Sequence, residues 1–208
     1  MLEARQIECI RGDRRLFHGL SFRLEAKQAL RISGENGSGK TSLLRMVAGL
    51  SPTQDGEICW NQARITALAE DYRRELVFIG HANGLKEDLS ALENLQHALA
   101  LSGRHVDCGE LRAALADHGL AAIAALPVKV LSQGQKRRVA LARLPFCAHK
   151  ALWILDEPFG SLDALAIARI EQLLVAHLHR GGMLLYTTHQ EVPLAGAQSQ
   201  SVELGYRR

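Results

Sequence analysis

The sequence has 208 residues, enough for one domain with a substantial core, and 47% of them are hydrophobic. The 25 Lys and Arg residues nearly balance the 22 Asp and Glu residues, so the formal net charge is +3 and nothing demands nucleic acid as a partner. The four cysteines form neither a zinc pattern nor a covalent haem motif, and no apolar run reaches the ~20 residues of a membrane span. We therefore expect a chain that is cytoplasmic in character, with any membrane role exerted through a partner.

The first part of the chain is predicted to form strands. Residues 2–10 and 20–25 alternate between apolar and polar side chains, which favours two half-buried strands with a turn at Gly12-Asp13. Residues 29–33 are largely apolar and indicate a buried strand. Further along, we expect a turn at Asp55-Gly56 and strands at 57–60 and 76–79.

A glycine-rich stretch, Gly34-Glu35-Asn36-Gly37-Ser38-Gly39-Lys40-Thr41, separates the strand at 29–33 from a predicted helix that begins at Ser42. A turn in this position directs several backbone N–H groups, and the positive end of the helix dipole, at one small volume that suits a phosphate. Three glycines let the backbone approach a ligand and adopt positive φ. Lys40 can reach the outer phosphates of a bound nucleotide, and the Thr41 hydroxyl can coordinate Mg²⁺.

Helices dominate the next segment, from about residue 86 to 148. Ser90 and Glu93 form a capping box for a helix at 91–102, and a second helix is expected at 108–118. Ser132 caps a further helix, again with a capping-box partner, Gln135. The simplest account is an all-helical insertion into an α/β core formed by residues 1–85 and 149–208.

The core resumes with an apolar run at 151–155, which is typical of a strand buried on both faces. A helix with apolar residues at helical spacing follows, and residues 183–188 predict a second buried strand that ends beside His189. The last twenty residues give no clear pattern, and we expect them to pack on the edge of the core.

Charged side chains follow these two buried strands directly. Asp156 and Glu157 come after the first, a position that is costly for carboxylates unless they serve a cation or a reaction. Ligands of open α/β sheets bind at the carboxyl ends of strands, so Asp156 can reach Mg²⁺ at Thr41 and Glu157 can polarise the water that attacks the γ-phosphate. His189 ends the second strand and is a candidate for contact with the γ-phosphate.

A second candidate anion site is the helix start at Leu131-Ser132-Gln133-Gly134-Gln135. By spacing alone, this segment is equally compatible with an ordinary capped helix that carries a solvated basic face. It begins 91 residues after Lys40 (131 − 40) and lies on the helical insertion. Two copies of the chain, head to tail, could place each such helix over the nucleotide of the other.

Together these residues resemble the ATP-binding cassette family, over nearly the whole chain. The resemblance rests on five motifs in order: Walker A at Gly34–Thr41, the signature at Leu131–Gln135, Walker B at Leu152–Glu157, the D-loop at Gly160–Asp163 and the switch histidine His189. It implies a P-loop ATPase fold with an antiparallel β edge, and a sandwich dimer that holds two ATP molecules and drives a membrane partner.

Within that family, the chain resembles the ATP-binding subunit of the cytochrome c maturation haem-export system. This narrower resemblance rests on short stretches at 3–5, 78–81 with 92–95, 135–144, 153–159 and 187–190. It implies a peripheral protein on the cytoplasmic face of the bacterial inner membrane, with an integral-membrane permease of the B-subunit type as partner. It also implies an ATPase cycle linked to the release of a haem-loaded periplasmic chaperone, and no residue suggests direct haem contact.

Three positions depart from the family pattern. His81 stands where most cassettes have a glutamine that bridges Mg²⁺, the attacking water and the membrane partner, and histidine titrates near neutrality. Gln133 replaces the first signature glycine, where a side chain could crowd the phosphate or add a donor. Arg11 stands where an aromatic residue usually stacks on adenine; a guanidinium can also stack, but Phe17 or no stacking is equally open.

Two other readings remain. The chain could serve another small exporter, which a co-purifying membrane protein would reveal. A soluble cassette protein that acts on nucleic acid would belong to a different class, but such proteins usually carry two cassettes or long inserted coiled coils, and this chain has neither.

Overall fold

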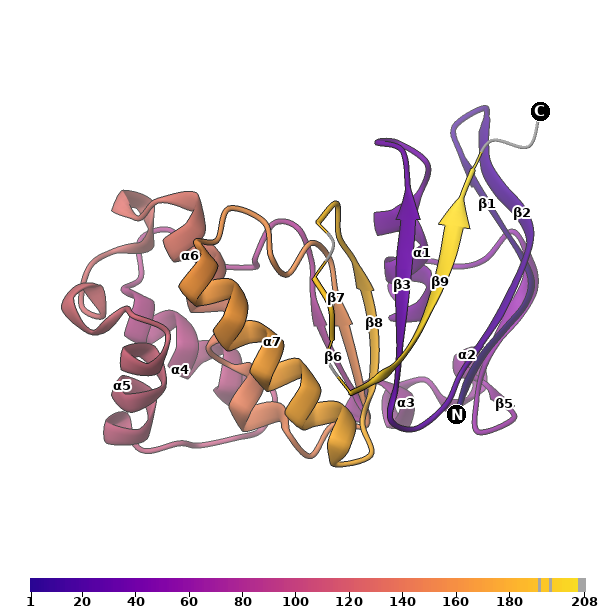
Figure 1. The fold of residues 1–208 in the computed structure, drawn as a ribbon. Helices are drawn as coiled ribbons and strands as arrows, with labels where there is room; N and C mark the ends of the chain where they lie inside the picture. Colours follow the sequence, from indigo (N-terminus) through magenta and orange to yellow (C-terminus); the bar gives the residue numbers. More distant parts are fainter. Residues whose placement is uncertain (191, 195, 206–208) are drawn as a thin grey trace. The chain divides into compact units, whose positions relative to one another are not determined.

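The structure is a computed structural model that describes residues 1–190, 192–194 and 196–205 (Figure 1). It divides into two compact units. The first comprises Met1–Phe78, Lys150–Glu157 and Leu174–Arg208, and the second comprises Ile79–His149 and Pro158–Leu173. The helical insertion expected at 86–148 lies within the second unit.

Two sheets form the first unit. An antiparallel sheet has the order β2-β1-β4-β5, and a five-stranded sheet has the order β6-β7-β8-β3-β9. In the five-stranded sheet, β3 pairs in parallel with β8 and β9, and β7 pairs in parallel with β8. The strands are β1 (Leu2–Arg11), β2 (Arg14–Leu24), β3 (Gln28–Gly34), β4 (Asp55–Trp60), β5 (Ala63–Arg64), β6 (Leu76–Ile79), β7 (Leu152–Leu155), β8 (Met183–Thr187) and β9 (Gln198–Leu204). This combination confirms the predicted fold class.

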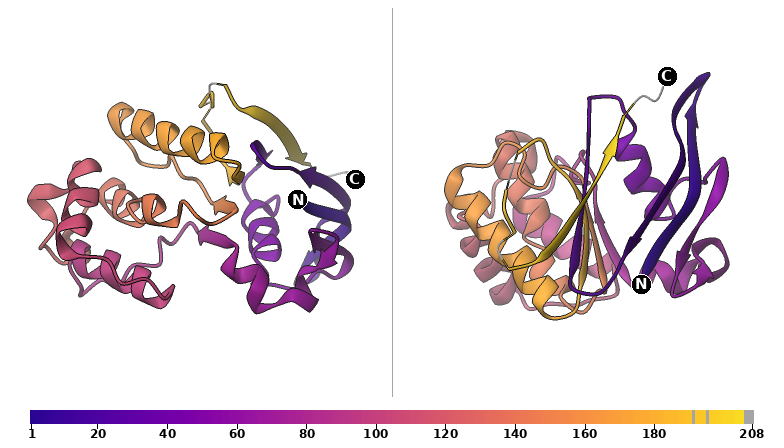
Figure 2. Two further views of the ribbon diagram at one scale, coloured as in Figure 1. Left: turned by 90° about the horizontal axis from the view of Figure 1, so that it is seen from below. Right: turned by 45° about the vertical axis from the view of Figure 1, so that its right-hand side comes forward.

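One apolar core joins both sheets to helix α1 (Lys40–Val47). Side chains of β1, β3, β7 and β8 contribute to it, and Leu43 and Leu44 of α1 are completely buried in it. Figures 1 and 2 show α1 between β3 and the long β1–β2 ribbon. Because α1 is held on both sides, the loop that leads into it is anchored at its helical end.

The turn predicted at Asp55-Gly56 is wrong. Both residues belong to β4, and Gly56 has a φ of +73°. Opposite them the register of β1 shifts between Arg5 and Glu8, and a Cβ atom at Gly56 would lie 2.3 Å from the carbonyl oxygen of Arg5. The glycine is therefore required by a β-bulge in the neighbouring strand, where the two backbones come too close for a side chain.

Four short or polar elements have no counterpart among the predicted ones. Two of them are the brief helices α2 (Ile65–Leu68) and α3 (Glu70–Arg74), and a third is β5, which has only two residues. The fourth, β9, has the polar sequence Gln-Ser-Gln-Ser-Val-Glu-Leu and pairs with β3 at the edge of the parallel sheet. The expectation that the last twenty residues pack on the core edge is confirmed for this strand.

The second unit is helical and has its own apolar core, which includes Leu95, Leu111, Leu115 and Val139. Its helices are α4 (Ala91–Leu101), α5 (Cys108–Asp117), α6 (Gln133–Leu141) and the first part of α7 (Ala164–His179), with 3₁₀ turns at Ala121–Ile123, Val128–Val130 and Leu144–Cys147. Both predicted capping boxes are confirmed: Ser90 with Glu93 at α4, and Ser132 with Gln135 at α6.

A histidine is buried against the strand β7 in the first unit. The ring of His177 stacks on Trp153, with centroids 3.9 Å apart and planes 5° from parallel, and its Nε2 lies 3.2 Å from the carbonyl oxygen of Met183. Its Nδ1 has no hydrogen-bond partner within the described residues. The neutral form with the proton on Nε2 fits these contacts, and burial lowers the pKa of His177 to about 4.

This burial makes the protein less stable in mild acid. The pKa of His177 lies below the value of about 6.5 expected in the unfolded chain. Neutral His177 therefore makes its full contribution to the stability of the folded state above pH 6.5, and this contribution is lost as the pH falls towards 4. From pH 7 to pH 5, His177 should account for a loss of about 2 kcal/mol in the free energy of unfolding, measured by urea denaturation. His177→Phe, which keeps a flat ring, should remove this part of the pH dependence.

His179→Phe is the matched control, because His179 lies two residues further along α7 and is exposed. This variant should keep the pH dependence of the wild type. An unchanged pH dependence in His177→Phe would contradict the assignment.

Candidate functional site

The glycine-rich loop connects the end of β3 to the start of α1. Gly39 caps α1 with a φ of +103°, and a Cβ atom there would lie 3.1–3.2 Å from atoms of Leu16 and Phe17. Gly34 has a φ of +140°, and a Cβ atom there would lie 2.4 Å from the carbonyl oxygen of Leu204. Both positions therefore require glycine, because the backbone conformation and the neighbouring atoms exclude a side chain.

The side chains of the loop present donors around the start of α1. Lys40 is only 9% exposed, and its Nζ donates hydrogen bonds to the carbonyl oxygens of Gly34 (2.8 Å) and Glu35 (3.0 Å). The buried Oγ of Ser38 has no hydrogen-bond partner among the described residues, and Ser42 is half-buried in the first turn of the helix. Glu35, Asn36 and Gly37 are exposed at the tip of the loop. An anion at this helix start would meet an ammonium, a hydroxyl and the N–H groups of the first turn.

Asp156 lies beside this helix start, at the end of β7. It is 2% exposed, and each of its carboxylate oxygens accepts a hydrogen bond of 2.8 Å: Oδ2 from the hydroxyl of Thr41 and Oδ1 from the hydroxyl of Thr187. The neighbouring strands β3, β8 and β7 bring these three residues together from distant parts of the sequence. The fold thus places a carboxylate and a hydroxyl, both oxygen ligands suited to Mg²⁺, in direct contact.

Glu157 and His189 lie at the same ends of neighbouring strands. Glu157 has a φ of +54°, which is unfavourable for a residue with a side chain, and its backbone N–H donates to Thr187 Oγ1 at 2.8 Å. The Oε1 of Glu157 lies 3.4 Å from Nε2 of His189, whose side chain is 55% exposed. This oxygen makes no hydrogen bond within the described residues, although it is buried. A carboxylate of this kind is available to accept a proton or orient a water molecule.

The first unit also holds both residues considered for adenine. Arg11 is exposed at the end of β1, where it pairs with Arg14 across the hairpin. Phe17 is largely buried, and its ring packs against the position of Gly39 under the phosphate loop. Phe17 therefore supports the loop from within the core.

The remaining predicted site residues belong to the second unit. Ser132 caps α6 through Gln135, Gln133 is the first residue of the helix, and a Cβ atom at Gly134 would lie 2.3 Å from the carbonyl oxygen of Ser161. Asp163 accepts a hydrogen bond from the backbone N–H of Ala166 at the start of α7. Within this unit the signature and the segment Gly160–Asp163 therefore lie against each other.

His81, also in the second unit, is exposed in the turn that follows β6. The buried Arg137 of α6 fixes this turn: its guanidinium donates to the carbonyl oxygen of Gly80 at 3.0 Å and to Oδ1 of Asn83 at 2.7 Å. Two hydrogen bonds thus connect the signature helix to residues on either side of His81. The sequence analysis did not foresee this contact. Arg137 lies in a run of basic residues after the signature, and nothing in the sequence indicates that its side chain is buried.

Thr187 contacts two of the predicted site residues, and the sequence analysis did not single it out. It is completely buried at the end of β8, and its hydroxyl contacts both Asp156 and the backbone of Glu157. The only signal in the sequence is a polar side chain at the end of an apolar strand, beside a second threonine and His189.

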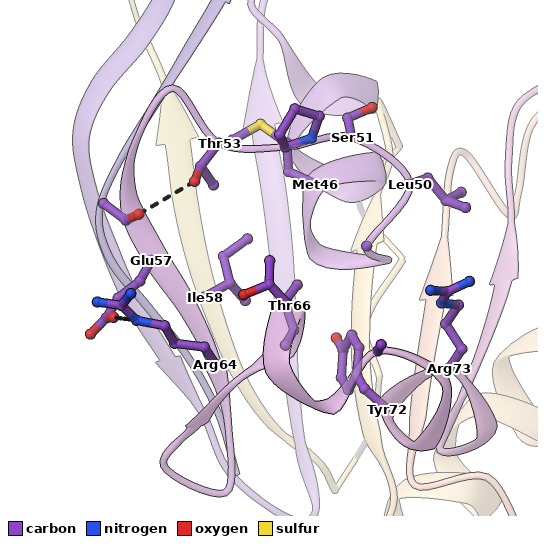
Figure 3. Close-up of a pocket in the computed structure, with 15 residues that line it drawn as sticks. Met46, Leu50, Ser51, Thr53, Glu57, Ile58, Arg64, Thr66, Tyr72 and Arg73 are labelled. Atoms are coloured by element: carbon purple, nitrogen blue, oxygen red, sulfur yellow. Dashed lines mark hydrogen bonds and ion pairs between the residues drawn. The ribbon is translucent and has the colours of Figure 1, made fainter.

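A hollow of about 530 Å³ lies at the opposite end of α1, around Leu50, Thr53, Ile65 and Tyr72 (Figure 3). Two of its polar side chains are engaged: Tyr72 donates to the carbonyl oxygen of Val47, and Arg64 pairs with Glu57. The C-terminal end of a helix also disfavours anions. The start of α1 therefore suits a phosphate better than this hollow does.

Known proteins resemble this chain over most of its length. The ABC transporter family profile matches residues 17–160. The cytochrome c biogenesis ATP-binding export protein CcmA of Nitrosospira multiformis is 48% identical over 203 residues, which cover 98% of each chain, and that of Nitrosomonas europaea is 50% identical over 94% of this chain and 91% of its own.

Solved structures show the same fold at lower sequence identity. A dimeric bacterial ABC transporter cassette aligns with a TM-score of 0.80 at 24% identity, over 99% of this chain and 95% of its own. A putative ABC transporter ATP-binding protein from Pyrococcus furiosus aligns with a TM-score of 0.78 at 22% identity, over 96% of both chains. By its sequence and its fold, this chain belongs to the ABC transporter family of ATPases, and within it to the CcmA family of cytochrome c biogenesis ATP-binding export proteins.

Proposed function

We propose that this chain is the ATP-hydrolysing subunit of a membrane complex in cytochrome c biogenesis, and that it powers haem export or the release of a haem-loaded periplasmic chaperone. The observation that carries the proposal is the contact between Thr41 and Asp156, next to a carboxylate, Glu157, and the phosphate loop. Nearly full-length relatives named as ATP-binding export proteins of cytochrome c biogenesis supply the process.

The loop residues Gly34–Ser42 bind the phosphates of ATP in this proposal. Backbone N–H groups and the Ser38 hydroxyl donate to phosphate oxygens, and Lys40 exchanges its carbonyl partners for the outer phosphates. Thr41 and Asp156 would hold Mg²⁺, which neutralises charge on the phosphates. Mg²⁺ bound to a nucleotide usually takes one or two carboxylates together with substrate phosphates, and Asp156 is the carboxylate available here.

Glu157 and His189 act on the γ-phosphate. The Oε1 of Glu157 orients the attacking water and accepts its proton, and His189, exposed beside it, donates a hydrogen bond to the phosphate. Ser132, Gln133, Gly134, Gln135 and Asp163 would complete the site from a second copy of the chain. The dimeric state of a solved cassette with the same fold supports this arrangement.

The proposed complex includes an integral-membrane permease of the B-subunit type and other cytochrome c maturation proteins, at the cytoplasmic face of the bacterial inner membrane. In the described part of the chain, no helix is long and apolar enough to cross a membrane. His81, in the turn held by Arg137, couples the nucleotide site to the permease. Neither haem nor nucleic acid contacts the chain in this proposal.

Complementation tests the proposal. A bacterium that makes c-type cytochromes and lacks its own homologous subunit would receive either this chain or its Glu157→Gln variant. Haem staining of periplasmic c-type cytochromes should reappear with the wild type only, and a membrane protein should co-purify with the chain. A wild-type chain that hydrolyses ATP but restores no cytochrome, and that co-purifies with a different permease or binds RNA with a steep salt dependence, would contradict the proposal.

A further inference from the structure

Thr187 connects the two acidic residues of the site through a single oxygen atom. Its Oγ1 accepts a hydrogen bond from the backbone N–H of Glu157 and donates one to Oδ1 of Asp156, both at 2.8 Å. A hydroxyl has only one proton to donate. Because that proton is given to Asp156, the hydrogen bonds at this oxygen have a defined direction, from the Glu157 N–H through Thr187 to the Asp156 carboxylate.

The position of Thr187 in the sheet explains why a side chain makes this link. The residue pairs in register with Ile32 of β3, and the pair before it joins Tyr186 to Leu155 of β7. β8 thus lies between the strand that leads to the phosphate loop and the strand that leads to the acids. Where β7 ends, the chain turns into the positive-φ conformation of Glu157, and the Thr187 hydroxyl provides the hydrogen-bond partner for its N–H.

We propose that Thr187 is a positioning residue for ATP hydrolysis: its hydroxyl fixes the rotation of the Asp156 carboxylate and holds Glu157 in the left-handed conformation that presents its side chain to the attacking water. This inference rests on the proposed function. Each oxygen of the Asp156 carboxylate accepts a hydrogen bond from one hydroxyl, Oδ2 from Thr41 and Oδ1 from Thr187, so removal of the Thr187 hydroxyl takes away the hydrogen bond at Oδ1. A rotation of either acid displaces a reacting group, and a misplacement of about 1 Å costs about 100-fold in rate.

Thr187→Val tests the role of the hydroxyl, because valine keeps the shape and β-branching of threonine. At saturating Mg²⁺, the kcat for ATP hydrolysis should fall about 10- to 100-fold, while the KM for ATP changes less than about threefold. Thr187→Ser, which restores the hydroxyl, should stay within about threefold of the wild type in kcat. Thr188→Val is the matched control: Thr188 is the next residue, it is also buried, and its hydroxyl exchanges hydrogen bonds with the backbone of Gln190.

A measurement independent of turnover separates this inference from the proposed function. In the presence of a non-hydrolysable ATP analogue, the affinity for Mn²⁺, measured by electron paramagnetic resonance, should fall severalfold in Thr187→Val and remain unchanged in Thr187→Ser. If the wild type does not hydrolyse ATP, the proposed function fails, and the Mn²⁺ titration still decides whether Thr187 orients Asp156.

Three results would overturn the inference: a wild-type kcat together with wild-type Mn²⁺ affinity in Thr187→Val, equal impairment of the Val and Ser variants, or a loss expressed in KM alone. Thermal unfolding followed by circular dichroism shows whether each variant is folded. Thr187→Ala replaces Thr187→Val if the latter does not fold, and the same comparison with Thr187→Ser then applies.

Discussion

Glu157→Gln should lower the rate of ATP hydrolysis by roughly 10²- to 10⁴-fold, the usual contribution of a general base, while ATP binding is retained. The Oε1 of Glu157 has no hydrogen-bond partner within the described residues and lies 3.4 Å from His189, so an amide can take the place of the carboxylate without breaking a hydrogen bond of that oxygen. The amide cannot accept a proton at neutral pH. Phosphate release measures hydrolysis, and isothermal titration with ATP measures binding.

Glu203→Gln serves as the control for this substitution, since Glu203 is an exposed glutamate on β9 in the same unit. It should leave both hydrolysis and binding unchanged. Full hydrolytic activity in Glu157→Gln would exclude Glu157 as the base and would direct attention to His189. Loss of ATP binding in the same variant would show that Glu157 has a structural role, through the backbone conformation it adopts.

Lys40→Met should weaken ATP binding by about 10- to 100-fold, because a hydrogen bond to a charged group contributes about 1.5–3 kcal/mol. Methionine has an unbranched side chain like lysine but neither its charge nor its donors. The substitution also removes the hydrogen bonds to the carbonyl oxygens of Gly34 and Glu35, so the loop should exchange its backbone hydrogens faster. Titration calorimetry and hydrogen exchange of residues 34–40 measure the two effects.

Lys129→Met is the control for Lys40→Met, since Lys129 forms an exposed ion pair with Asp88 in the second unit. It should bind ATP as the wild type does. A Lys40→Met variant with wild-type affinity for ATP would mean that the nucleotide does not use this loop, and the proposed function would lose its basis.

The sequence predicted the parts of the fold that rest on strong local patterns. The apolar runs that lead to Gly34 and to Asp156 are buried strands, and Ser90 and Ser132 cap their helices as their capping boxes indicate. Such patterns are local, so they can be read without knowledge of the tertiary structure.

Features that depend on distant contacts could not be read in this way. Asp55-Gly56 has the composition of a turn. The glycine is instead required because it lies opposite a bulge in β1, about fifty residues earlier in the chain. β9 is polar because it is an edge strand, and so it lacks an apolar run. The burial of Arg137 and Thr187, and with it their hydrogen bonds near His81 and Glu157, arises only when the elements pack.

Trp153, stacked on His177, gives this protein an intrinsic fluorescent probe. Trp153 lies in β7, three residues before Asp156, and its indole is completely buried against the His177 ring. The chain has only one other tryptophan, Trp60 of β4, which packs against Tyr72. With Trp60 replaced by phenylalanine, the fluorescence emission of the chain would come from the strand that carries the acidic residues, and its wavelength and intensity would follow the packing of that strand directly.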